Sequence, residues 1–266
     1  MKPVKALGSQ GIRRYWEKNA RTYGLSHEAS WTDRYAIELE VREMGRQLED
    51  GDRVLDAGCG NGFTALHLVS KKQVRLDGID YIPAMVRNAR KRFKAYPKLS
   101  KRVDFKAGNV TKLDKPSGIY DKVVAVRLFI NLTKKADIQK GLSECARVLK
   151  PNGRLLLSDA TLEGWKRLNQ MRREWGLSAI PIPVFNRYLK EKEFLRFAAK
   201  DFKLVELINF SSTYFIGTRV LKPILIKTLG LKTDPADPLS EWNRLFLELP
   251  AWGDYGTQKL FVFEKK

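Results

Sequence analysis

Short apolar runs alternate along this chain with longer segments whose apolar residues recur every three or four positions. The runs predict strands that begin at Arg53 and that span 74–80, 103–109, 120–129, 154–160, 203–210 and 258–263. The other segments predict helices over 9–24, 33–49, 63–71, 84–96, 134–149, 161–175 and 190–201. Strands that alternate with helices are typical of an α/β fold built on a mostly parallel sheet. The nearly unbroken apolar run at 120–129 indicates a strand that is covered on both faces.

Three glycines join the first predicted strand to the helix that follows it. They stand at every second position after Asp56, in the pattern D-x-G-x-G-x-G that ends at Gly62. Glycine permits strained turns and lets a ligand approach the backbone, so this context indicates a nucleotide-like ligand. The dinucleotide pattern G-x-G-x-x-G would need glycine at Phe63, which excludes pyrophosphate spacing. A turn that only connects the two elements is the alternative interpretation.

Asp80 ends the second predicted strand, at the same edge of the sheet as the glycine turn. A carboxylate at this place can accept hydrogen bonds from both hydroxyls of a ribose. Left buried without a partner it would be costly, which favours a ligand over a solvated turn.

The D-x-G-x-G-x-G pattern at Asp56–Gly62 resembles the first motif of class I S-adenosylmethionine (SAM)-dependent methyltransferases. The resemblance covers roughly the first two thirds of the chain. The segment Gly108-Asn109-Val110 is similar to the third motif of that family, with Asn109 where an acid is usual, and Lys150–Gly153 is similar to its L-K-P-G-G turn. The resemblance implies a Rossmann-like sheet of seven strands in the order 3-2-1-4-5-7-6. The last strand would be antiparallel and helices would cover both faces.

The resemblance also implies a cofactor site for SAM, with S-adenosylhomocysteine as product and no metal. In the family, a W-x-x-x-A-x-x-Y segment like that of Trp16, Ala20 and Tyr23 covers the cofactor, although these aromatics would alternatively only dock their helix on the core. Asp80 would hold the ribose. The expected cofactor-binding residues are Tyr15, Tyr23, Asp56, Gly58, Cys59, Gly60, Asp80, Tyr81, Asn109, Val110 and Arg127.

Catalysis and acceptor binding are less determined by the sequence. Arg127 at the end of the fourth strand would either hold a carboxylate or form a structural pair with an acid. Asp159, at the tip of the fifth strand, is the first candidate for a general base, or else the N-cap of the helix over 161–175. His27 and Tyr214 are further candidates for the base.

The chain is expected to form one domain over 1–266. Residues 1–49 would form N-terminal cap helices, 50–161 the SAM-binding core, and 162–202 and 211–257 insertions that cover the substrate. The 211–257 segment is expected to hold two helices and to act as a lid. Its portion 217–231 is either a membrane-surface helix or a helix packed on the core.

Composition and charge bear on the compartment and the acceptor. Two cysteines and two histidines lack disulfide or metal-ligand spacing, and neither a secretory signal nor a long apolar run is visible, so a cytoplasmic enzyme is expected. The net charge of +20 favours anionic partners, but its densest part, near 94–102, is expected at the rim opposite the cofactor.

A small-molecule acceptor, most simply a hydroxyl of a sugar, phenol or lipid intermediate, is therefore the leading hypothesis. The stretch Phe210–Tyr214 and the aromatic insertion after it resemble methyltransferases of sugar and surface-polysaccharide pathways. An RNA or protein methyltransferase that uses the basic surface, and a non-catalytic SAM-binding protein, are the alternatives. The oligomeric state stays open.

Overall fold

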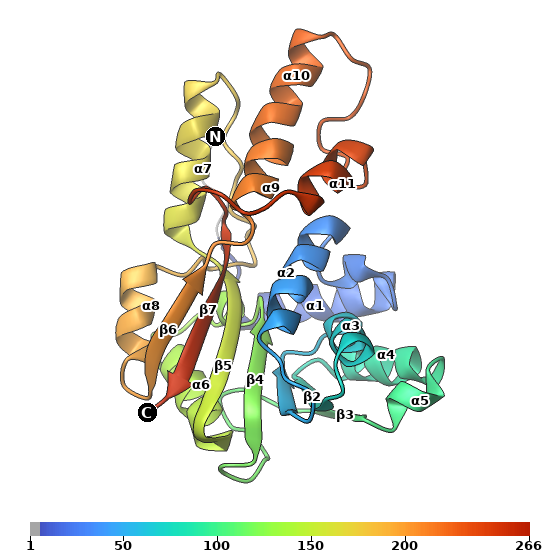
Figure 1. Ribbon diagram of the computed structural model, residues 1–266, viewed down its shortest axis with the longest axis vertical. Helices are drawn as coiled ribbons and strands as arrows, with labels where there is room; N and C mark the ends of the chain where they lie inside the picture. The colour runs from blue at the N-terminus through green and yellow to red at the C-terminus, as the bar shows by residue number, and fades with distance from the viewer. Residues whose placement is uncertain (1–5) are drawn as a thin grey trace.

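A mixed seven-stranded sheet forms the centre of the computed structural model, which describes residues 6–266 (Figure 1). The first five residues of the expected 1–49 segment lie outside the described residues. The strand order β3-β2-β1-β4-β5-β7-β6 confirms the expected topology. Strands β1 to β5 run parallel to one another, and β7 is antiparallel to β5 and β6. The strands are β1 Arg53–Ala57, β2 Arg75–Asp80, β3 Val103–Ala107, β4 Tyr120–Val126, β5 Leu149–Ala160, β6 Phe202–Ile208 and β7 Gln258–Lys265.

Each predicted helix is present, and local sequence signals explain the starts of α2 and α4. Pro83 occupies the first turn of α4, and the Asp33 carboxylate caps α2 by accepting the Ala36 N–H at 3.0 Å. The helices are α1 Ser9–Tyr23, η1 His27–Ala29, α2 Arg34–Arg46, α3 Phe63–Lys71, α4 Pro83–Lys94, α5 Pro97–Ser100, η2 Phe129–Asn131, α6 Lys135–Val148, α7 Leu162–Glu174, α8 Glu191–Ala198, α9 Ser212–Ile216, η3 Gly217–Leu221, α10 Lys222–Thr228 and α11 Glu241–Glu248.

Two apolar cores lie on opposite faces of the sheet, because successive strand residues point to opposite sides. Val54 and Val124 belong to the core beneath α2, α3 and α4, whereas their neighbours Leu55 and Val123 belong to the core beneath α6 and α8. The strands are therefore buried on both faces, as the unbroken apolar run of β4 predicts. Their carboxyl ends are thereby held at one edge, where a ligand can bind.

The long connection between β6 and β7 is a helical insertion that stands above the sheet, beside α7 (Figure 1). Elements α9, η3 and α10 continue one another, and α11 follows after an irregular stretch, in agreement with the two expected helices. The Tyr214 hydroxyl donates to Asp33 at 2.7 Å, and Arg219 forms an ion pair with the same carboxylate. The insertion is thereby tied to the start of α2.

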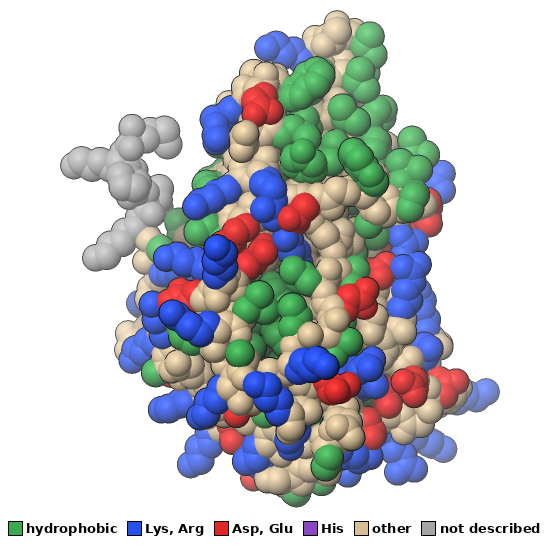
Figure 2. All heavy atoms as spheres, turned by 60° about the vertical axis from the view of Figure 1, so that its left-hand side comes forward, with side chains coloured by type: hydrophobic (Ala, Val, Ile, Leu, Met, Phe, Trp, Pro, Cys, Tyr) green, Lys and Arg blue, Asp and Glu red, His purple; other side chains and the backbone are tan. Residues whose placement is uncertain are grey.

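The upper part of the insertion carries exposed apolar side chains, which gather at the top of the molecule (Figure 2). Val220 is buried, but Leu225 and Leu229 on α10 and just after it are exposed. Among the described residues, no helix has the length and apolar character needed to cross a membrane.

The close packing of β2 on β3 gives a first expectation. A Cβ added at Gly78 would lie 2.5 Å from Cδ1 of the buried Phe105 ring. We expect Gly78→Ala to lower the free energy of unfolding by about 1–3 kcal/mol, because the packed ring has no free space to enter. Urea denaturation measures the change. Gly45→Ala is the matched control, since its Cβ would meet only Leu68 at 3.9 Å, and equal destabilisation by both would contradict the packing argument.

Candidate functional site

The glycine turn after β1 uses each glycine differently. Gly58, Gly60 and Gly62 all have positive φ, a conformation that non-glycine residues adopt only with strain. A Cβ on Gly62 would press on Ala89 of α4 at 3.0 Å, so this glycine serves helix packing. A Cβ on Gly60 would meet nothing within 4 Å. Gly60 therefore borders open space into which a ligand fits.

Two adjoining cavities lie at the carboxyl ends of the strands. The first, of about 90 Å³, lies over the glycine turn, and the second, of about 340 Å³, lies beside the end of β3. They share Gly58, Asp80, Tyr81, Leu128 and Asn131, so they form one continuous groove. An elongated molecule with two polar ends fits such a groove.

Asp80 holds the groove together. One carboxylate oxygen accepts the Gly60 N–H at 3.0 Å and the other accepts the Ile82 N–H at 2.8 Å. Burial raises the pKa of Asp80 to about 6, against the effect of these two hydrogen bonds. The carboxylate thus fixes the glycine turn against the start of α4 and still lines both cavities.

Asp56 is the second buried carboxylate of the groove. Its Oδ2 has no hydrogen-bond partner among the described residues. Burial, and secondly the negative charge of Asp80, raise the pKa of Asp56 to about 7. Two acids in such surroundings favour a cationic group in the first cavity, because a positive charge would relieve both the repulsion and the missing contact.

Arg127 follows β4 in a left-handed conformation, with φ of 50°. Its Nε lies 3.3 Å from Oε2 of the fully buried Glu40, so the structural pair with an acid is present. Burial raises the pKa of Glu40, and the charge of Arg127 opposes that rise. The Asn131 side chain donates to the Arg127 carbonyl at 2.7 Å, which stabilises the strained backbone. Arg127 also lines the first cavity.

A separate space, the aromatic chamber of about 120 Å³, continues from the first cavity. The two share Trp16, Ser30, Arg127 and Asn131. The other chamber walls include Trp31, Phe185, Asn186, Tyr188 and Gln258. Two polar atoms of chamber residues, Nη1 of Arg127 and Oδ1 of Asn186, lack partners among the described residues. The chamber therefore combines aromatic walls with unused hydrogen-bonding capacity.

Most residues expected to bind the cofactor line this groove. The first cavity is lined by Asp56, Gly58, Cys59, Gly60, Asp80, Tyr81 and Arg127, and the second by Asn109 and Val110. Tyr15 instead stacks on Phe185 at 3.9 Å between ring centroids, and Tyr23 is exposed. Those two lie outside the residues that line the cavities and the chamber.

The three candidate bases do not come together. Asp159 is fully buried and accepts the Phe129 N–H at 2.9 Å, which holds the turn after β4. The alternative role of Asp159 as N-cap of α7 is wrong, because Thr161 caps that helix by accepting the Gly164 N–H at 3.1 Å. Tyr214 is buried beneath the insertion, and His27 lies beside the Thr32 carbonyl. None of the three lines the groove or the chamber.

Several lining residues were absent from the expected set. Thr64 and Met85 stand in the first turns of the helices that follow β1 and β2, so their position after the two motifs is a usable signal. Tyr188 and Asn186 come from an irregular stretch before α8, where periodicity gives no information. Only the fold brings that stretch to the strand ends.

Comparison with known proteins supports the resemblance to methyltransferases that the sequence motifs show. A family model described as "Methyltransferase domain" matches residues 54–153. A probable S-adenosylmethionine-dependent methyltransferase of Mycolicibacterium smegmatis is 36% identical over 135 residues, which cover 51% of this chain and 47% of that protein. The 27-O-demethylrifamycin SV methyltransferase of Amycolatopsis mediterranei is 32% identical over 181 residues, which cover 65% of this chain and 61% of that protein. The chain thus spans about half to two thirds of the length of these relatives.

Solved structures show the same fold over nearly the whole chain. A putative methyltransferase in complex with the Haloferax volcanii Trm112 activator superimposes with a TM-score of 0.62 at 18% identity, covering 98% of both chains. The [4+2]-cyclase SpnF gives a TM-score of 0.61 at 18% identity, covering 99% of this chain and 98% of that one. Taken with the glycine turn, Asp80 and the strand order, the family model and the sequence relatives identify residues 54–153 as a class I SAM-dependent methyltransferase domain.

Proposed function

We propose that this protein transfers a methyl group from SAM to a small-molecule acceptor, most simply to a hydroxyl oxygen. The observation that carries the proposal is the junction of two spaces: a groove lined by two buried carboxylates and suited to a nucleoside cofactor adjoins an aromatic chamber through four shared residues. Methyl transfer is an in-line displacement, and holding the two reactants in contact is the main contribution that a protein makes to it.

The residues of the groove fit SAM. The open space over Gly60 admits a ligand close to the backbone, and the unpaired Oδ2 of Asp56 suits a cationic amino group. Asp80 would hold the ribose hydroxyls, and Asn109 with Val110 would hold the adenine in the second cavity. Arg127, which retains an unpaired Nη1 beside its Glu40 contact, would hold the carboxylate. SAM supplies an electrophilic methyl group on its sulfonium.

The aromatic chamber would receive the acceptor. Its walls exclude water and suit the flat face of a ring. Burial raises the pKa of Tyr188 to about 12, so this phenol stays neutral near pH 7 and can donate a hydrogen bond but cannot act as the base. Asp159 and Tyr214 are engaged by Phe129 and Asp33, so we assign them positioning roles rather than contact with the acceptor.

A small-molecule acceptor agrees with the relatives' names. They include an O-methyltransferase of Aspergillus nomiae and a demethylmenaquinone methyltransferase of Deinococcus radiodurans. The basic run supports a nucleic-acid partner less well, because several of its arginines serve the fold. Arg92 donates to the Asn61 carbonyl at 2.9 Å and Arg102 to the Lys72 carbonyl at 2.8 Å. SpnF, which is described as a [4+2]-cyclase, has the same fold. The fold alone therefore does not establish methyl transfer, and turnover must be measured.

The function is tested by incubating the protein with methyl-labelled SAM and a small-molecule extract, in parallel with RNA and protein fractions. We expect label to enter the small-molecule fraction, because the chamber admits a small head group and not a polymer. Heat-inactivated protein is the control. Label in RNA or protein alone, or binding of SAM without transfer to any fraction, would contradict the proposal.

Asp80→Ala is expected to weaken S-adenosylhomocysteine binding about 10- to 100-fold, since it removes a charge-assisted contact and frees the Gly60 turn. Isothermal titration calorimetry measures the affinity. Asp104→Ala, on the exposed side of β3, is the matched loss of a carboxylate and should bind normally. Unchanged affinity in folded Asp80→Ala protein would sink the ribose assignment.

The raised pKa values of Asp56 and Asp80 predict opposite pH effects on folding and binding. Because both folded pKa values exceed the ordinary value, the free protein loses stability as pH rises from about 4 to 7, as the buried carboxyls ionise. A cationic ligand favours the ionised forms, so S-adenosylhomocysteine affinity should rise about tenfold from about pH 5.5 to pH 7.5.

Calorimetry in buffers of different ionisation enthalpy should therefore detect proton release on binding, and Asp56→Asn should reduce it. Asp114→Asn, outside the groove, serves as the control. Proton uptake, or release that Asp56→Asn leaves unchanged, would contradict the assignment of Asp56 to the amino group.

A further inference from the structure

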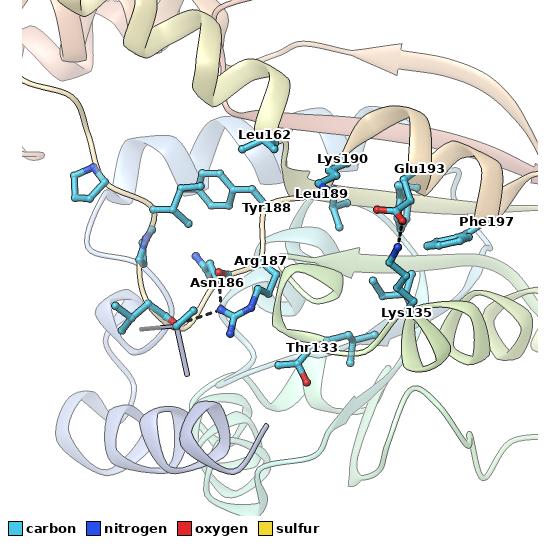
Figure 3. Close-up of a pocket in the computed structure, with 18 residues that line it drawn as sticks. Thr133, Lys135, Leu162, Asn186, Arg187, Tyr188, Leu189, Lys190, Glu193 and Phe197 are labelled. Atoms are coloured by element: carbon cyan, nitrogen blue, oxygen red, sulfur yellow. Dashed lines mark hydrogen bonds and ion pairs between the residues drawn. The ribbon is translucent and has the colours of Figure 1, made fainter. Parts of the chain in front are cut away.

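A third cavity, much larger than the chamber, lies on the other side of the irregular stretch 181–190. Its volume is about 810 Å³, within the range of about 300–1,000 Å³ that small-molecule sites occupy. Eighteen residues line it, most of them are apolar, and the largest group comes from this stretch (Figure 3). We call it the tail cavity.

Three of the four charged side chains that line the tail cavity, Lys135, Arg187 and Glu193, already have partners, and the fourth, Lys190, is exposed. Lys135 forms an ion pair with Glu193 at its edge, as Figure 3 shows. The Arg187 guanidinium donates to the backbone carbonyls of Leu7, Val184 and Asn186. These charges therefore do not require an ionic ligand, and the apolar walls determine what the cavity would bind.

The tail cavity and the aromatic chamber share a wall. Pro183, Asn186 and Tyr188 line both of them, so a single layer of side chains separates the two spaces. Backbone hydrogen bonds fix the wall below: Arg187 N–H donates to Ile130 at 2.7 Å and Leu189 N–H to Ala160 at 2.9 Å. Rotation of the Asn186 or Tyr188 side chain would join the spaces without unfolding the stretch.

We infer that the tail cavity holds an apolar chain attached to the methyl acceptor, whose polar head occupies the aromatic chamber. The acceptor would then be an amphipathic molecule, a hydroxylated ring or similar head group that bears an alkyl or isoprenoid chain. This inference rests on the proposed function, because it makes the chamber the acceptor site. The shared wall carries it: a head group in the chamber has its nearest apolar neighbour space directly behind Tyr188 and Asn186.

The competing apolar surface is the exposed top of the insertion around Leu225 and Leu229. That surface lies outside the residues that line the chamber and the tail cavity. An apolar probe that bound there would overturn the inference. The experiment must therefore separate the two locations.

Binding of the neutral fluorescent probe N-phenyl-1-naphthylamine to the full chain provides the first test. Ile182→Trp and Val184→Trp each fill the tail cavity from its wall, and two variants guard against one that fails to fold. We expect both to weaken probe binding at least about tenfold, while S-adenosylhomocysteine affinity stays within about twofold.

Two control variants locate the probe. Leu204→Trp adds the same bulk on the exposed face of β6, and Leu229→Ser removes an apolar side chain from the top of the insertion. Both should bind the probe normally. Full probe affinity in the two cavity variants, or an equal loss in Leu229→Ser, would overturn the inference.

Displacement of the probe by linear alcohols tests the nature of the ligand. Each added methylene should tighten binding roughly fourfold from 1-hexanol to 1-decanol, as expected for transfer of a chain into an apolar site. The gain should be smaller in Ile182→Trp, because less of the chain can enter. Displacement that does not depend on chain length would contradict a chain-binding cavity.

The labelled-methyl assay then separates the two proposals. The labelled product should partition into heptane from water, because the acceptor carries its chain. A product that stays in water would overturn this inference and leave methyl transfer intact. Failure of S-adenosylhomocysteine binding would overturn the proposed function, a result that the probe and alcohol measurements do not share.

Discussion

The carboxylate of Asp80 joins the two halves of the cofactor groove, and the rest of the site depends on it. Its oxygens receive N–H groups from the turn after β1 and from the start of α4, so one side chain fixes the relative positions of two strand ends. The cost of burying it is visible in its raised pKa. A position that retains such a group beside a second unpaired acid, Asp56, is organised for a ligand rather than for stability alone.

The core of the fold could be derived from the chain because its signals are local. The alternation of apolar runs and helical segments gives the strands, and Asp56, the three glycines and Asp80 occur within one strand–helix–strand unit. Residues that are close in these sequence patterns are also close in the fold, because the ends of neighbouring parallel strands lie at the same edge of the sheet. The sequence alone allows two roles for Arg127, because its partner Glu40 is distant in sequence and meets it only in the fold.

The proposed acceptor side could not be derived in the same way. The chamber and the tail cavity share a wall from the irregular stretch before α8, whose place is fixed by hydrogen bonds to Ile130 and Ala160. The pattern of apolar and polar residues does not predict such contacts. The position of Asp159 at a strand end suggests an accessible side chain. In the structure, however, the turn after β4 covers it, and the Phe129 N–H donates a hydrogen bond to its carboxylate. Burial of a strand-end acid depends on the following turn, which sequence patterns describe poorly.

Asp33 connects the insertion between β6 and β7 to helix α2 beside the groove. This one carboxylate caps α2, accepts the Tyr214 hydroxyl and pairs with Arg219 of the insertion, while α2 also carries Glu40, the partner of Arg127. The insertion and the helix beside the groove are therefore mechanically one part. An engineer who exchanged the insertion for that of a relative would also need to transfer its anchor on α2, because a mismatched pair would displace Glu40 and with it Arg127, which lines both the groove and the aromatic chamber.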